Sequence, residues 1–425
     1  MLFEVLTTTV MGGIALKAYV KKQGLTTNDS GKIQRIISLS GLNVKDGKDT
    51  LSTQLIRKKH YDWGWEYAYR IPLGRSFDDY LAKQRVLEDG LNNRRQRVTI
   101  ADLKALQLDG NLITSLKTLR KRKLTEHKEV EVTFDGLLKI RVYDEPLPSK
   151  IEWDESLLTS GSWAVPIGYM RNGEVIEHDF DKSKHLIVAG ATGFGKSVIL
   201  KLIVTTLIRQ QNENTELSLF DLKGGSAFQR FRDCKQVKYY ARNPQDVAEL
   251  LERVQTDMQT AFESVVDNGY EDVKEAGIKK RHFVIIDEAA DLAENKKATA
   301  IITDIARRGR SAGYYLIFCT QYPTTAVLDS QVKRNIISRL CYVVDTDTAS
   351  RVVLDEGGAD KLPAIPGRGI YKNNVKRYIV QSPFISNDAI KKQIAEHYVK
   401  KEAIALEKED TRQTRGSDTV TFEAM

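Results

Sequence analysis

The sequence predicts an α/β protein, in which a parallel sheet with helices on both faces follows a smaller α+β domain. From residue 163 onward, short apolar strands alternate with helical runs, which is typical of such a sheet. Before residue 150, alternating strands mix with a helical stretch. The segment DEPLPSK (144–150) carries two prolines that favour extended chain and mark a boundary. A length of 425 residues, 41% of them hydrophobic, suffices for two or three domains.

Residues 1–20 form a short hydrophobic N-terminal segment. Glu4 and Lys17 bound an uncharged run over 5–16, whereas a membrane-spanning helix needs about twenty apolar residues. We expect a core segment or a surface anchor, so membrane association through this segment stays open. The three cysteines form no CxxC pair and the six histidines are scattered, which predicts neither a disulfide framework nor a zinc site. A reducing, cytoplasmic location fits this composition.

Residues 21–150 form the predicted basic α+β domain. Strands are expected over 129–143 and helix over 76–95. The domain holds 26 Lys+Arg against 17 Asp+Glu, so the excess of the whole chain, formally +8, belongs to it. Such a charge suits nucleic acid, although the same side chains could simply solvate helix faces. The basic clusters are RKKH (57–60), RRQR (94–97) and KTLRKRK (117–123).

Residues 151–400 form the predicted α/β domain. Helices are expected over 196–210 and 244–266, and the polar tail 401–425 is expected to be disordered. The expected strands are rich in β-branched and aromatic residues and cover 185–190, 216–221, 282–287, 314–320 and 340–345.

The stretch GATGFGKS matches the phosphate-binding pattern G-x-x-x-x-G-K-[ST] between a predicted strand and a predicted helix. Glycines allow backbone N–H groups to curl around phosphates, and the helix N-terminus adds partial positive charge. We expect Lys196 to reach the β- and γ-phosphates of ATP and the Ser197 hydroxyl to bind Mg²⁺. The predicted nucleotide-binding residues are Gly190, Ala191, Thr192, Gly193, Phe194, Gly195, Lys196 and Ser197.

A second motif, RHFVIIDEAA (281–290), places two acids at the end of an apolar strand. Asp287 there suits a Mg²⁺-binding role, and Glu288 suits a general base that polarises the attacking water. The alternative is a strand that ends in two solvated acids.

Two further segments hold candidate catalytic residues. Gln321 follows the strand 314–320 and could sense the γ-phosphate or orient water, because an amide both donates and accepts hydrogen bonds. The alternative is a polar residue at a strand end, hydrogen-bonded to backbone. ARRGRSAGY (306–314) carries Arg307, Arg308 and Arg310, of which Arg310 is the first candidate to stabilise transition-state charge from a neighbouring subunit. DNA-phosphate contacts and surface salt bridges remain alternatives for these arginines.

Five segments in this order resemble the motor domain of the FtsK/SpoIIIE family of DNA translocases over about residues 150–385. They are HLIVAGATGFGKSV, FDLKGG, VIIDEAAD, ARRGRSAGYYLIFCTQYP and SRVVLDEGGADKLPAIPGRGIY. The resemblance implies a RecA-like P-loop motor that hydrolyses ATP at the interfaces of a hexameric ring around double-stranded DNA. It also places Asp221 and Lys223 as neighbours of the site.

The layout departs from the chromosome-segregation members, which carry several N-terminal membrane helices and a C-terminal winged helix. It is closer to compact FtsK-like proteins of mobile elements, which implies a role in DNA transfer or element replication, with a relaxase or a membrane channel as partner. A protein-export ATPase and an ATP-switched DNA-binding protein are the alternatives. Export relatives usually carry several motor domains in tandem, whereas this sequence has one phosphate loop.

Overall fold

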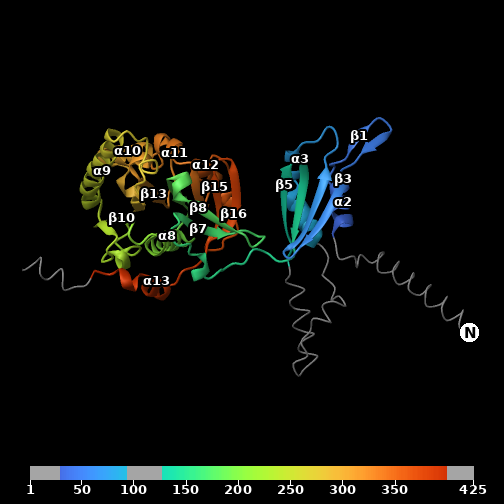
Figure 1. Ribbon diagram of the computed structural model, residues 1–425. Coiled ribbons are helices and arrows are strands. Elements are labelled where there is room, and N and C mark those ends of the chain that lie inside the picture. Colours follow the sequence, from blue (N-terminus) through green and yellow to red (C-terminus); the bar gives the residue numbers. More distant parts are fainter. Residues whose placement is uncertain (1–28, 93–126, 400–425) are drawn as a thin grey trace, which may run out of the picture. The chain divides into compact units, whose positions relative to one another are not determined.

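The computed structural model describes residues 29–92 and 127–399 of the chain. The predictions for 1–20, for 401–425 and for the basic clusters 94–97 and 117–123 lie outside these residues. The chain divides between Leu147 and Pro148 into two compact units (Figure 1), a division that falls inside the proline-containing segment 144–150. We call them the front unit and the P-loop unit.

The front unit is built on a four-stranded antiparallel sheet in the order β3-β4-β6-β5. β4 alternates aromatic and small or charged residues, so Tyr67 and Tyr69 point to one face and Glu66 and Ala68 to the other. The strands are β3 (Gln54–Tyr61), β4 (Gly64–Arg70), β5 (Glu129–Asp135) and β6 (Leu137–Tyr143), and a small hairpin pairs β1 (Val44–Asp46) with β2 (Asp49–Leu51).

Helices cover one face of this sheet. The predicted helix over 76–95 is two helices, because the chain leaves helical geometry at residues 82–83. Ser76 and Asp79 form a capping box that starts the first of them. The helices are α2 (Ser30–Leu39), α3 (Phe77–Leu81) and α4 (Gln84–Asn92), and the shared core includes Ile33, Ile37, Tyr67, Tyr80, Leu87, Leu91, Val130 and Ile140.

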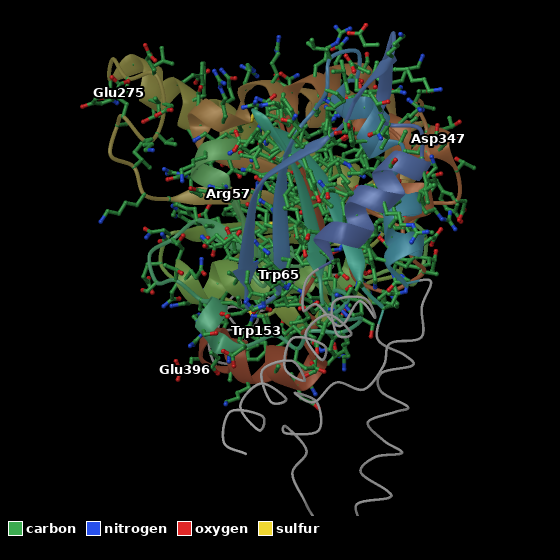
Figure 2. The ribbon with its side chains drawn as sticks, turned by 90° about the vertical axis from the view of Figure 1, so that its right-hand side faces the viewer. Arg57, Trp65, Trp153, Glu275, Asp347 and Glu396 are labelled. Carbon is green, nitrogen blue, oxygen red and sulfur yellow. The ribbon has the colours of Figure 1, made fainter. Side chains whose placement is uncertain are left out.

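The other face of the front sheet carries ion pairs. Arg141 Nε lies 3.0 Å from Glu66 Oε2, and Arg141 Nη1 lies 3.3 Å from Glu131 Oε2. Arg57, labelled in Figure 2, lies on the edge strand β3. Its guanidinium lies 3.8 Å from the Glu66 carboxylate. The described residues of this unit hold 14 Lys+Arg and 14 Asp+Glu, so the predicted basic excess belongs to residues outside the described ranges.

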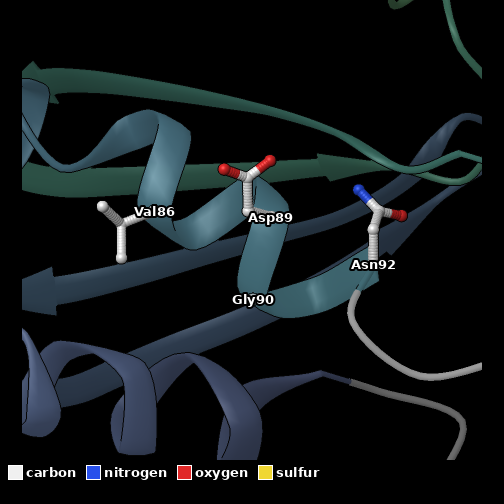
Figure 3. A pocket seen from close by; sticks show the side chains of 4 residues that line it. All are labelled: Val86, Asp89, Gly90 and Asn92. Atoms are coloured by element: carbon white, nitrogen blue, oxygen red, sulfur yellow. The ribbon is translucent and has the colours of Figure 1, made fainter.

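A hollow of about 450 Å³ lies along α4 (Figure 3), lined by Val86, Asp89, Gly90 and Asn92. Gly90 lets α4 pack closely on α2, because a Cβ at this position would lie 2.6 Å from Ile36 Cδ1. This hollow holds none of the predicted site residues, and Asn92 is the last described residue before the gap.

The P-loop unit contains a ten-stranded sheet in the order β11-β10-β12-β13-β9-β14-β15-β16-β7-β8. The strands from β11 to β14 are parallel, as expected for strands joined through helices. The other four add an antiparallel edge that the sequence did not predict. The parallel strands are β9 (Leu186–Ala189), β10 (Thr215–Asp221), β11 (Val237–Ala241), β12 (Arg281–Asp287), β13 (Tyr314–Thr320) and β14 (Ser338–Tyr342), and the edge comprises β7 (Ala164–Tyr169), β8 (Val175–Asp179), β15 (Arg368–Asn373) and β16 (Lys376–Gln381).

Helices pack on both faces of this sheet, as predicted (Figure 1). α8 (Lys196–Gln210) and α13 (Asn387–Ile394) share one core with it, and α9 (Pro244–Asp267) and α10 (Lys296–Ala312) share the opposite core. α8 begins and ends where the sequence predicts. The shorter helices are α7 (Phe180–Ser183), α11 (Ser330–Asn335) and α12 (Asp347–Leu354).

Across 29–92 and 127–399, no helix combines the length and the apolar composition needed to cross a bilayer.

Candidate functional site

The phosphate-loop motif lies between β9 and α8, at the carboxyl edge of the parallel strands. Gly193 and Gly195 adopt φ values of +85° and +107°, which favour glycine. Gly190 is needed for space as well, since a Cβ there would lie 2.7 Å from Tyr342 Cβ. The loop is therefore shaped by its glycines, and α8 starts directly behind it with its N-terminal amides facing the same edge.

Backbone groups from outside the phosphate loop hydrogen-bond to it. The N–H of Gly367 donates to the Phe194 carbonyl at 3.0 Å, and the N–H of Ala191 donates to the Val343 carbonyl at 2.7 Å. GRG (367–369) belongs to the last of the five segments that resemble the family, but the sequence predicted no role for it. Its contact with the loop appears only when β14 and β15 are paired in the sheet.

Lys196 is buried and folds back onto the loop that carries it. Its ammonium donates to the carbonyl oxygens of Gly190, at 2.5 Å, and Ala191, at 2.8 Å. Burial lowers the pKa of Lys196, and nearby Lys223 acts in the same direction, while Glu288 and Asp287 oppose them. The charges of the two predicted acids therefore act on Lys196.

Asp287 ends β12 with a fully buried carboxylate. Apart from the Cys319 thiol, a weak donor, neither of its oxygens has a hydrogen-bond partner among the described residues. Burial raises its pKa, and the Lys223 ammonium partly offsets this. An unpartnered buried acid is costly, so this carboxylate is built for a ligand that carries positive charge.

Glu288 follows in the left-handed conformation, with φ +68°, which is uncommon for a residue other than glycine. Only 5% of it is exposed. The Thr320 hydroxyl and the Gln321 N–H donate to Oε1 at 3.0 and 3.1 Å, and the Gln321 side-chain amide donates to Oε2 at 2.6 Å. These donors fix the carboxylate at the same edge of the sheet as the phosphate loop.

Gln321 joins the phosphate loop to Glu288. The hydroxyl of Thr192, in the loop, donates to Gln321 Oε1, while Gln321 Nε2 donates to Glu288. The reason is topological, since β13, which leads to Gln321, lies between β12 and β9. The Gln321 side chain thus bonds to two other side chains and not to backbone alone, and its sensor role stays a prediction.

The two residues on FDLKGG take different positions. Asp221 is fully buried, and its carboxylate accepts the N–H groups of Lys223, Ala227 and Phe228 at 3.3, 2.6 and 3.1 Å. It therefore shapes the loop after β10. Lys223 reaches the acids instead, with Nζ 3.8 Å from Glu288 Oε2.

The arginines lie elsewhere. They are near the C-terminal end of α10, which precedes β13, whereas the phosphate loop and Glu288 follow the carboxyl ends of their strands. Arg307 and Arg308 contact Asp304 at 3.1 and 2.5 Å, as the surface salt-bridge alternative predicts. Arg310 is exposed and forms no ion pair within the described ranges. Burial lowers the pKa of His185, just before β9, and the Arg310 charge acts in the same direction. Arg310 therefore does not join the site of its own chain.

The residues present fit ATP and Mg²⁺. The loop offers backbone N–H groups shaped by glycines, and Lys196 is held by carbonyl oxygens that phosphate oxygens can replace. Carboxylate and hydroxyl oxygens are ligands that Mg²⁺ accepts, and Asp287 and Ser197 supply them.

Residues 153–283 match the FtsK/SpoIIIE family, so the chain carries an FtsK/SpoIIIE domain. The DNA translocase FtsK of Streptococcus pneumoniae is 28% identical over 279 residues, covering 60% of this chain and 35% of the relative. The DNA translocase SpoIIIE of Bacillus subtilis is 30% identical over 269 residues, covering 57% and 33%. The matched region thus spans about a third of the length of these curated relatives.

Two solved structures show the same fold. The pCW3 conjugation coupling protein TcpA, in a monomer form with ATPγS, aligns with a TM-score of 0.56 at 19% identity, covering 89% of this chain and 99% of TcpA. The cytoplasmic domain of the Type VII secretion ATPase EccC of Thermomonospora curvata aligns with a TM-score of 0.52 at 22% identity, covering 60% and 34%. The predicted RecA-like P-loop fold is confirmed.

Proposed function

We propose that this chain, which carries an FtsK/SpoIIIE domain, is an ATPase that drives double-stranded DNA translocation as a ring motor. One observation carries the proposal, namely that direct hydrogen bonds join the phosphate loop, Gln321 and Glu288 at the sheet edge where the unpartnered Asp287 ends β12. The curated relatives that match are themselves named DNA translocases. ATP is the proposed substrate nucleotide, with Mg²⁺ as its metal.

The proposed chemistry follows from the contacts. Loop amides and Lys196 bind the phosphates. Glu288 accepts a proton from the attacking water, which can approach once a group that donates to this carboxylate moves away. Gln321 couples the loop to that carboxylate through Thr192. Ser197 and Asp287 would hold Mg²⁺, which supplies positive charge to the phosphate oxygens when bound.

Arg310 is proposed to act from the neighbouring subunit. It is exposed, unlike the ion-paired Arg308, and it lies away from its own chain's phosphate loop. Transition-state charge can be stabilised by an arginine supplied in trans. A ring, which the family resemblance describes as hexameric, would bring such an arginine to each site.

The proposed partners follow from DNA transfer. They are duplex DNA, further copies of this chain, and a relaxase or a membrane transfer channel of a mobile element. The name of TcpA, a conjugation coupling protein, supports this choice. The proposed location is the cytoplasm, with membrane association through residues 1–20 included.

The test is ATP hydrolysis with and without linear duplex DNA at two salt concentrations, together with displacement of a third strand from a DNA triplex. We expect DNA to stimulate hydrolysis and this stimulation to weaken with salt, because phosphate neutralisation dominates non-specific DNA binding. We also expect triplex displacement that needs ATP. Lys196→Ala is the control and should lose both activities.

The same measurements separate the alternatives. A DNA-independent ATPase that responds to a secreted protein would favour the export function suggested by the fold of EccC. ATP-dependent DNA binding without triplex displacement would favour a switch. Either result contradicts translocation.

A further inference from the structure

Glu288 has one cationic neighbour within ion-pair distance among the described residues, and it comes from a different strand. Lys223 Nζ lies 3.8 Å from Glu288 Oε2, and the Lys223 side chain is 28% exposed. The other donors to this carboxylate, the Thr320 hydroxyl and the two Gln321 groups, are neutral. Lys196 instead donates to carbonyl oxygens of the phosphate loop. The positive charge beside Glu288 therefore comes from Lys223.

The loop that carries Lys223 is held by hydrogen bonds to a buried carboxylate. The Asp221 carboxylate, fully buried, accepts three backbone N–H groups within residues 223–228. Gly224 and Gly225 allow the turn, with φ values of +81° and +89°, and Phe228 anchors its far end in the core. Asp221 and Asp287 are paired residues of neighbouring strands, so the turn after β10 opens beside the acids that follow β12.

The position of Lys223 beside Glu288 has an electrostatic consequence. Asp287 and Glu288 are adjacent and almost fully buried, and like charges repel strongly at low dielectric. The Lys223 cation offsets this repulsion and contacts Oε2 from the loop that follows β10. Gln321 holds the same oxygen from β13, so the carboxylate is fixed from two sides.

We propose that Lys223 is a positioning residue, which holds the Glu288 carboxylate in the orientation needed to accept a proton from water. The proposal rests on the ATP hydrolysis proposed above. Lys223 acts through Glu288, so its loss should reduce turnover and leave nucleotide affinity nearly unchanged.

The experiment compares Lys223→Met and Lys223→Arg with the parent chain, measuring steady-state ATP hydrolysis and the binding of fluorescent ATP and ADP analogues. We expect Lys223→Met to lower kcat about tenfold or more, because a misplaced base loses part of the acid–base contribution. Analogue affinities should stay within about twofold, and Lys223→Arg should recover part of the rate because it restores the charge.

Lys238→Met is the matched control. Lys238 lies near the start of the neighbouring β11 and contacts Asp257 at 2.9 Å, so this variant also removes a lysine from an ion pair, but one at the amino end of the strands. Its kcat should match the parent. An equal loss in both variants would point to a general structural effect and overturn the proposal.

A double variant tests the route. If Lys223 acts through Glu288, adding Lys223→Met to Glu288→Gln should leave the residual single-turnover rate unchanged. A further loss, or a selective loss of ATP over ADP affinity, would assign Lys223 to the phosphates and overturn the positioning role. A parent chain that hydrolyses no ATP would instead refute the proposed function, and this inference with it.

Discussion

Glu66 in the front unit and Asp287 in the P-loop unit are both buried carboxylates on β-strands, but their surroundings differ. Glu66 lies 3.0 Å from Arg141 and 3.8 Å from Arg57. Asp287 has no ion pair among the described residues and only a thiol as a hydrogen-bond neighbour. The same contrast holds for arginines, since Arg141 is paired whereas Arg310 is exposed and unpaired within those ranges. The ion pairs of Glu66 support the fold, whereas Asp287 and Arg310 are the groups for which we propose a ligand and a partner chain.

The largest expected effect concerns the unpaired arginine. Arg310→Ala should lower turnover by about 10³-fold or more without weakening ATP binding, because an arginine supplied in trans stabilises the transition state. Phosphate release and analogue binding check this. Arg308→Ala is the paired control and should mainly lower the melting temperature, since Arg308 contacts Asp304 and Gln259 in its own chain.

Mixing two variant chains tests whether Arg310 acts in trans. Rings that combine Arg310→Ala with Glu288→Gln subunits contain some interfaces with an intact arginine and an intact base. Partial recovery of turnover is expected. No recovery in rings proven to be mixed would contradict the assignment.

The second prediction concerns the base. Glu288→Gln should lower turnover by about 10²-fold or more and retain ATP binding, because the amide keeps the shape but accepts no proton. Rapid-quench kinetics and analogue binding separate the two quantities. Glu131→Gln, in the ion-paired face of the front sheet, is the control and should hydrolyse ATP at the parent rate.

The third prediction concerns the basic sequence outside the described ranges. Replacing Arg120, Lys121, Arg122 and Lys123 by Gln should weaken DNA binding about tenfold or more at low salt and flatten its salt dependence. Replacing Lys45 and Lys48, in the described and electrically neutral part of the front unit, should change binding much less. Equal effects would contradict the assignment of DNA binding to the basic cluster.

The smallest effects are on stability, and they have opposite signs. Glu66→Gln should cost about 1–2 kcal/mol, because Arg141 loses one of its two carboxylate partners while remaining partly solvated. Asp287→Asn should raise stability within the range of about 0.5–2 kcal/mol seen for single stabilising changes, because it removes a buried charge. Thermal melting without nucleotide measures both variants.

The stabilisation by Asp287→Asn should depend on pH. Burial raises the pKa of Asp287 above its ordinary 3.8, so the folded state favours the protonated acid. Stability contributed by this group is present below that ordinary value and is lost as pH rises through the folded pKa. The advantage of the Asn variant should therefore grow between about pH 4 and pH 7. A constant difference would contradict an ionised, unpartnered Asp287.

Much of the P-loop unit could be predicted because its signals are local. Apolar runs predicted β10, β12 and β13, and α8 begins at the lysine of the phosphate-loop motif. The antiparallel edge was missed, since its two hairpins, β7–β8 and β15–β16, join through the pairing of Tyr169 with Gln381, residues some 200 positions apart. The break at residues 82–83 was missed as well, because the helical pattern continues across it.

The amino-acid sequence by itself determined the phosphate loop, the acid pair and the strand–helix alternation, because each depends on residue types at fixed spacing. Only the tertiary structure decided that Gln321 joins Thr192 to Glu288, that Asp221 builds a loop while Lys223 reaches the acids, and that Arg310 lies away from its own site. The physical reason is strand order. β13 lies between β12 and β9, and β10 lies on the other side of β12, so residues distant in sequence meet at one edge.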